Sequence, residues 1–172
     1  MQTLSRRAAL AGAASLAVLA SCNAVGNEPI RTRANEARYA NDPLRRLTDA
    51  QWQARLEELP YRVLRHEATE RSGTSPLNDE HRRGTFVCAG CALPLFTSAM
   101  KFDSGTGWPS FFTTIPNVFA TKTDTLLIMP RTEYHCVKCG GHHGHVFDDG
   151  PAPTGLRYCN NGVALRFIPQ KA

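Results

Sequence analysis

The chain has 172 residues, of which 42% are hydrophobic, and this is enough for one packed domain but not for two. The same hydrophobic content argues against wholesale disorder. The formal net charge is +5, but the Lys and Arg residues are scattered and form no dense basic stripe. We therefore expect a mildly basic globular protein that does not bind nucleic acid.

Residues 1–21 have the pattern of a signal peptide. Arg6 and Arg7 precede a run of small and apolar residues that ends at Ala20, which is too short to span a bilayer but has the length of a signal-peptide hydrophobic core. The following sequence, Leu-Ala-Ser-Cys up to Cys22, resembles the lipobox of bacterial lipoproteins. We therefore predict a lipidated Cys22 that anchors the protein to a membrane, facing the periplasm. A plain secretory signal with an incidental cysteine is the alternative.

The export route and the segment after the signal can also be read from the sequence. The two adjacent arginines fit a twin-arginine signal, which exports folded proteins, and an ordinary signal equally well. Residues 22–45 are rich in Asn, Arg, Ala and Pro and show no apolar period, so they are predicted to be a tether. Residues 46–172 then form the folded domain.

A short helix is predicted at the start of this domain. Thr48 and Gln51 form a capping-box pattern. Apolar residues follow at helical spacing, at Trp52, Leu56 and Leu59. Because proline interrupts helices, Pro60 is expected to end a helix over residues 49–59, with Trp52 in the core.

From about residue 84 the sequence is typical of β-structure. Short apolar and β-branched runs alternate with Gly, Pro, Asn and Asp. These runs cover residues 85–87, 93–96, 110–112, 125–129, 132–135, 145–147 and 164–168. No strand–helix–strand alternation is present, so the predicted fold is mainly antiparallel β behind short N-terminal helices.

Four of the six cysteines form two Cys-x-x-Cys pairs, Cys88 with Cys91 and Cys136 with Cys139. Each pair follows a strand-like run and enters a glycine-containing turn, in which two thiolates can face one ion. Together the two turns supply the four sulfurs of a tetrahedral zinc site. Such a site has no position for a catalytic water, so the zinc would be structural. A pair of disulfides, which an exported location favours, and a redox-active pair are the alternatives.

Cys159 stands apart from these pairs, between Arg157 and Asn161. Side chains alternate along a strand, so these three residues are expected to share one face. A guanidinium group beside a thiol favours the reactive thiolate, and an amide can position a substrate or a water. From spacing alone, Cys159 is either a nucleophile or a small buried core residue.

Two further groups of side chains are candidates for the same site. His142 and His145, three residues apart across a glycine, can donate or accept protons near neutral pH. The alternatives are a second metal site, with Asp148 or Asp149 as further ligands, and solvated loop histidines. Trp108 lies in a glycine-rich turn and offers either a rigid wall for an apolar methyl group or an ordinary core residue.

Together these motifs resemble the B-type peptide-methionine (R)-S-oxide reductases. The likeness runs from about Leu47 to Ile168. The matching stretches are residues 78–81, 88–91, 101–105, 107–111, 136–142, 144–150 and 157–159, together with Asn161. The resemblance implies a mainly β fold of two antiparallel sheets, a β-tent, with a structural Zn²⁺ held by the four paired cysteines.

The resemblance also implies a site and a reaction. Cys159 matches the catalytic cysteine of the family. In the family, a pocket holds the substrate's methyl group and sulfoxide oxygen, and its residues correspond here to Trp108, His142, His145 and Asn161. Polar residues near the family's nucleophile correspond to Arg157 and Asp149. The thiolate would attack the sulfoxide sulfur while a histidine protonates the oxygen, leaving methionine and a sulfenic acid. The expected protein is a monomer that repairs the R-epimer in oxidised proteins and is regenerated by a thioredoxin-like or small thiol.

The sequence departs from the family pattern at three positions. Thr106 stands where many members carry a resolving cysteine, and His143 and Asn160 stand where aliphatic residues are usual. With four cysteines on zinc and Cys22 lipidated, no thiol remains to form an internal disulfide with Cys159. We therefore predict that an external thiol attacks the oxidised Cys159 directly.

Overall fold

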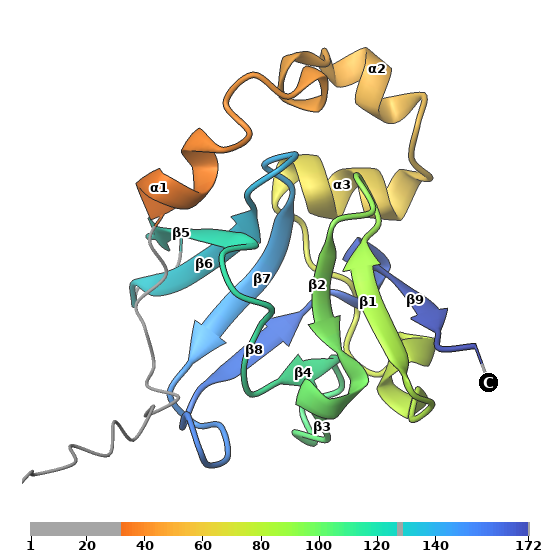
Figure 1. Cartoon of the computed structure of the whole chain (residues 1–172), viewed down its shortest axis with the longest axis vertical. Coiled ribbons are helices and arrows are strands. Elements are labelled where there is room, and N and C mark those ends of the chain that lie inside the picture. Colours follow the sequence, from red (N-terminus) through yellow and green to blue (C-terminus); the bar gives the residue numbers. More distant parts are fainter. Residues whose placement is uncertain (1–31, 127–128, 172) are drawn as a thin grey trace, which may run out of the picture.

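The computed structural model describes residues 32–126 and 129–171 (Figure 1). The predicted signal peptide, Cys22 and the first part of the predicted tether lie outside the described residues, so these predictions stay untested. Within the described ranges, no helix is both long and apolar enough to cross a membrane.

The last part of the predicted tether, residues 22–45, is folded onto the domain. It contains helix α1 (Thr32–Ala37) and part of a 3-10 turn (Pro43–Arg46). The buried Asn35 amide donates to the Phe119 carbonyl at 3.1 Å, and the Arg45 guanidinium donates to the Val137 carbonyl. Polar side chains bonding to distant carbonyls hold this segment, so its lack of an apolar period did not reveal the docking.

The helix predicted over residues 49–59 is instead two helices, α2 (Asp49–Gln53) and α3 (Glu58–His66). The capping box at Thr48 is present, and Trp52 is buried in the core, as predicted. The expectation that Pro60 ends a helix was wrong. Pro60 lies in the first turn of α3, where the backbone N–H groups have no helical partner and its missing N–H costs nothing.

Two antiparallel sheets make up the rest of the domain, which confirms the predicted fold class (Figure 1). The smaller has the order β2-β1-β9, from strands Pro94–Thr97, Gly84–Cys88 and Leu165–Pro169. The larger has the order β3-β4-β8-β7-β6-β5. Its strands are Lys101–Phe102, Ser110–Phe111, Arg157–Asn160, His142–Phe147, Arg131–Cys136 and Phe119–Asp124. Helix α3 lies across one end of both sheets in Figure 1.

Aromatic side chains fill the space between the sheets. Phe96 of β2 stacks on Phe111 of β4 with ring centroids 3.9 Å apart, and Phe86 of β1 meets the same ring at 5.1 Å. Phe119 of β5 packs edge-on against Tyr134 of β6. All five rings are buried, and each contributes roughly 1.5–3 kcal/mol by leaving water. This shared core fixes the two sheets against each other.

One predicted strand is misplaced. The apolar run at residues 125–129 was expected to be a strand, but β5 ends at Asp124, and residues 127–128 lie outside the description. The Asp124 carboxylate accepts the backbone N–H of Leu126 at 2.9 Å, which starts a turn, and Leu126 and Met129 are exposed. The strand next to this run therefore lies before it, at Phe119–Asp124, where no strand was predicted from the sequence.

The two unusual residues His143 and Asn160 are both fully buried. The side-chain amide oxygen of Asn160 accepts a hydrogen bond from the Tyr134 hydroxyl at 2.8 Å, across the glycine at position 144 that lies between their strands. The His143 ring packs against Phe119 and Tyr134, and burial lowers its pKa to about 3, so it is neutral. These polar residues therefore act as core packing, Asn160 from the strand that carries Cys159 and His143 from the neighbouring strand.

Candidate active site and zinc centre

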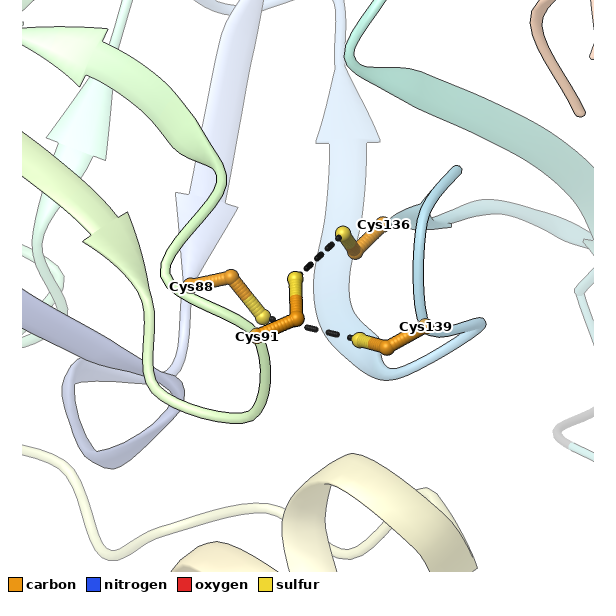
Figure 2. A group of neighbouring side chains, drawn as sticks. All are labelled: Cys88, Cys91, Cys136 and Cys139. Carbon is orange, nitrogen blue, oxygen red and sulfur yellow. Dashed lines mark hydrogen bonds between the residues drawn. The ribbon is translucent and has the colours of Figure 1, made fainter. Parts of the chain in front are cut away.

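The four paired cysteines converge on one point (Figure 2). Their sulfur atoms all lie within 4.8 Å of one another. The sulfur atoms of Cys88 and Cys139 are 3.7 Å apart, and those of Cys91 and Cys136 are 3.5 Å apart. Each close contact therefore joins one Cys-x-x-Cys turn, or zinc knuckle, to the other. Zn–S bonds of about 2.3 Å in a tetrahedron separate the sulfurs by about 3.8 Å, whereas a disulfide needs about 2.05 Å. The cluster therefore fits the predicted structural zinc, and all four thiols are free.

The two knuckles have the same backbone geometry. In one, the N–H of Ala92 donates to the carbonyl of Cys88, and in the other Gly140 donates to Cys136, both at 2.8 Å. Ala92 and Gly140 both have positive φ angles, of 59° and 73°. Because Cys88 ends β1 and Cys136 ends β6, the zinc joins the smaller sheet to the larger one.

Cys159 lies on β8 and is half-buried, outside the hydrophobic core cluster. It pairs with Ser110 of β4 and His145 of β7, so these three side chains share a face. Burial raises the pKa of the Cys159 thiol, while the charge of Arg157 and hydrogen bonds from Thr106 and Arg157 oppose that rise. Thr106, which stands where a resolving cysteine was considered, therefore lies close enough to Cys159 to affect the pKa of its thiol.

The Arg157 guanidinium is fixed from two sides. It forms a bidentate ion pair with Asp149, at 2.7 and 2.8 Å, and lies over the Phe147 ring at 4.3 Å from its centroid. The ion pair lowers the pKa of Asp149. Asp149, predicted as a substrate-binding residue, therefore contacts Arg157 and reaches the site through it.

His142 is buried at the start of β7 and is oriented by a carboxylate that the sequence did not reveal. Its Nδ1 lies 2.7 Å from a Glu133 oxygen on β6, while its Nε2 is buried and bonds to no described residue. Burial alone would raise the pKa of Glu133, but hydrogen bonds from His135 and His142 lower it to about 2. The ionised Glu133 therefore fixes the orientation of the His142 ring and leaves its Nε2 without a partner among the described residues.

His145 has a second carboxylate partner, Asp124, whose oxygen lies 2.7 Å from its Nε2. Burial lowers the pKa of His145, and the bond to Asp124 opposes this. The His142 and His145 rings are 5.5 Å apart, so the predicted pair does converge. Among the described residues, the four cysteines are the only group of three or more side chains placed to share a metal, so the structure does not support a second metal site at the histidines.

Trp108 and Asn161 meet at another residue that was not predicted, Glu70. The Trp108 indole donates to the Glu70 carbonyl at 3.1 Å. The Asn161 side chain accepts the Glu70 N–H at 2.9 Å and donates to the His143 carbonyl at 3.0 Å. Asn161 lies just after the end of β8 and is buried, so its amide braces the site instead of projecting freely beside Cys159.

A small pocket borders the tryptophan. Its volume is about 200 Å³, and its lining includes Trp108, Pro109, Phe102 and Lys101. Cys159 does not line it, but Phe102 pairs with Ser110, which in turn pairs with Cys159. The pocket therefore lies on the same sheet as Cys159, with β4 between its Phe102 wall and the strand that carries Cys159.

The domain has two sheets, a four-thiolate zinc centre and one separate cysteine that lies among Arg, Thr and His side chains. This combination defines a thiol oxidoreductase that is stabilised by a structural zinc. Residues 56–169 match the family model described as the SelR domain. The chain is 52% identical over 124 residues to the peptide methionine sulfoxide reductase MsrB of Thiobacillus denitrificans, an alignment that covers 72% of this chain and 94% of the relative. It is 51% identical over 126 residues to the protein of that name from Bradyrhizobium diazoefficiens, covering 72% and 89%. The chain belongs to the SelR-domain family of methionine sulfoxide reductases.

Proposed function

We propose that Cys159 is the nucleophile with which this methionine-R-sulfoxide reductase repairs oxidised proteins. The observation that carries the proposal is the placement of Cys159. Among the described cysteines it alone lies outside the zinc cluster, and it is half-buried on the same face as His145 and touches Thr106 and Arg157. A cysteine in such a polar, partly open position is suited to reaction and not to core packing.

The reaction follows from these side chains. The Cys159 sulfur attacks the sulfoxide sulfur, and a histidine, His142 or His145, directly or through a water, protonates the sulfoxide oxygen. The oxygen is transferred to Cys159, which becomes a sulfenic acid as the substrate sulfur is reduced to the thioether of methionine. Trp108 would contact the methyl group, and Arg157 would stabilise the thiolate.

The test of this function is an epimer assay. With dithiothreitol as reductant, the purified protein is expected to reduce the R-epimer of a blocked methionine sulfoxide and to leave the S-epimer unchanged, because each epimer requires its own enzyme. Chromatographic separation of the products measures both rates. Equal rates for the two epimers would contradict the assignment.

We expect recycling to use an external thiol. After one turnover without reductant, Cys159 should remain a sulfenic acid, because the described cysteines other than Cys159 are committed to zinc. Two reducing thiols, from a thioredoxin-like protein or a small thiol, would then restore Cys159 and release water. Trapping with a sulfenic-acid reagent and intact mass measures this. A rapid internal disulfide in the wild type would disprove it.

Thr106→Cys provides the converse test. Because the Thr106 side chain contacts Cys159, a cysteine at position 106 is expected to form a disulfide with Cys159 after turnover. Mass spectrometry should then show the loss of the sulfenic acid and the gain of a linked peptide. Thr106→Ser, which keeps the hydroxyl, is the matched control and should behave as the wild type does.

We also propose that the protein is a monomeric lipoprotein facing the periplasm. The support is the sequence alone, a signal-like segment that ends at Cys22. The mature protein should begin at a lipidated Cys22 and sediment with membranes, whereas Cys22→Ala should give an unlipidated form. N-terminal mass spectrometry tests this, and a soluble wild type that retains Met1 would contradict it. Changing Arg6 and Arg7 to Lys distinguishes the twin-arginine route from the general one.

A further inference from the structure

Glu70 is a buried acidic residue in the segment between α3 and a 3-10 turn (Pro76–Asp79), and only 2% of its surface is exposed. It lies outside the set of groups that the reaction above uses. Its main chain nevertheless bonds to two side chains of the site. The carbonyl accepts the Trp108 indole N–H at 3.1 Å, and the N–H donates to the Asn161 side chain at 2.9 Å.

The Glu70 carboxylate holds the backbone that follows Asn161. One oxygen accepts the N–H of Gly162, and the other accepts the N–H of Val163 at 3.1 Å. No ion pair to Glu70 is present in the described part of the chain. A buried carboxylate without a cation is unfavourable unless hydrogen bonds replace its hydration, so these two bonds are what hold Glu70 in place. Burial raises its pKa, and the two N–H groups oppose that.

The same segment also holds the loop that carries Thr106 and Trp108. The Ser72 hydroxyl donates to the Thr106 carbonyl, and the N–H of Gly73 donates to the Gly107 carbonyl, both at 2.8 Å. Gly107 has a φ of 85°, and a Cβ there would come within 2.1 Å of the Ser72 hydroxyl, so the loop fits against this segment only with glycine. The Glu70 carboxylate fixes the start of the segment that makes these two contacts.

We propose that Glu70 is a positioning residue for the reduction, which anchors its segment to the end of β8 and so fixes Trp108 and Asn161 relative to Cys159. The inference rests on the proposed function in that Trp108 contacts the substrate. Cys159 itself is held by the strand pairing of β8 with β4 and β7, which does not involve Glu70. Loss of the Glu70 carboxylate should therefore impair substrate binding and leave the thiol as it is.

The test is Glu70→Gln in the full chain. A glutamine offers one acceptor and places an NH₂ group against a backbone N–H, so one bond is lost and two donors face each other. KM for methionine-R-sulfoxide is expected to rise about tenfold, the factor that corresponds to losing a hydrogen bond to a charged group. The rate at which iodoacetamide alkylates Cys159 should stay within about twofold of the wild-type rate, because Cys159 makes no bond to Glu70.

Acrylamide quenching gives a readout that does not require activity. The chain has two tryptophans, of which Trp52 is buried and Trp108 is partly exposed, so the quencher reports mainly on Trp108. Glu70→Gln should increase the quenching of Trp108. Ser75→Ala is the matched control, because Ser75 is a buried polar residue that packs against Gly162 and bonds to the backbone of Leu77. Loss of the Ser75 hydroxyl should leave KM and the quenching of Trp108 unchanged.

The outcomes separate this inference from the proposed function. A Glu70→Gln variant with wild-type KM and quenching would overturn the positioning role, and so would a variant in which quenching, alkylation and zinc content all change together. If Glu70→Gln does not fold, Glu70→Asp keeps the charge and shortens the reach, and an unchanged KM in that variant would equally overturn the role. A wild type that does not reduce the sulfoxide would contradict the function, while quenching would still report on Glu70.

Discussion

Cys159→Ser is expected to abolish reduction of methionine sulfoxide while the fold and the zinc content stay intact. A serine oxygen is a poor nucleophile towards sulfoxide sulfur and cannot accept the transferred oxygen as a sulfenic acid does. The value of kcat should fall by on the order of 10⁴-fold or more, the range seen when a covalent nucleophile is removed. The side chain is half-buried and the exchange replaces one sulfur by one oxygen, so no large cavity is left.

The measurement needs three readouts on one preparation: turnover with dithiothreitol, zinc content by mass spectrometry and thermal unfolding. Ser110→Ala is a useful comparison, because Ser110 is the direct neighbour of Cys159 on β4 and is buried. It should retain turnover to within about tenfold, since it lacks any role in the chemistry. Full turnover by Cys159→Ser would disprove the proposed mechanism.

The sequence predicted those features whose causes are local. The capping box at Thr48 needs two residues three apart, and each zinc knuckle needs two cysteines in one turn, so short patterns indicated both. The mainly antiparallel fold followed from short strand-like runs punctuated by turn residues. The position of Cys159 on a strand between Arg157 and Asn161 was predicted in the same way.

Features set by contacts between distant segments were not predicted. The carboxylates Glu133 and Asp124, which orient His142 and His145, come from β6 and from the end of β5, and no local pattern connects them. Alternation along 132–135 could have placed Glu133 on one face of a strand, but its partner is fixed only by the pairing of β6 with β7.

Asn161 shows that strand alternation predicts the direction of a side chain only within the strand itself. It was expected on the same face as Arg157 and Cys159, but β8 ends at Asn160, and the chain then enters a 3-10 turn. Its amide is therefore turned to the backbone of Glu70 and of His143. In this structure the shared face holds Arg157 and Cys159, while a role for Asn161 at the substrate oxygen stays a prediction.

Cys139→Ser is expected to lose zinc and most of the stability of the domain together. Each thiolate of a closed four-sulfur site is deprotonated and bound, and binding of structural zinc contributes about 10–16 kcal/mol in zinc-finger peptides, which is comparable to the whole stability of an ordinary domain. Here the metal joins β1 to β6, so its loss releases the smaller sheet from the larger one. The aromatic core between the sheets would remain, and should leave a partly ordered but weakened domain.

We expect about one zinc per chain in the wild type and a fall in Tm of more than about 15 °C in Cys139→Ser, which corresponds to roughly 5 kcal/mol for a domain of this size. A strong chelator should lower the Tm of the wild type in the same way. Cys159→Ser is the matched control, because it removes one thiol outside the cluster and should keep both zinc and Tm. If the wild type contains no metal and melts cooperatively with the four knuckle thiols unreactive, the cysteines are paired as disulfides. The sulfur separations of 3.5 and 3.7 Å argue for the metal, since they match the edge of a zinc tetrahedron and exceed the length of a disulfide bond.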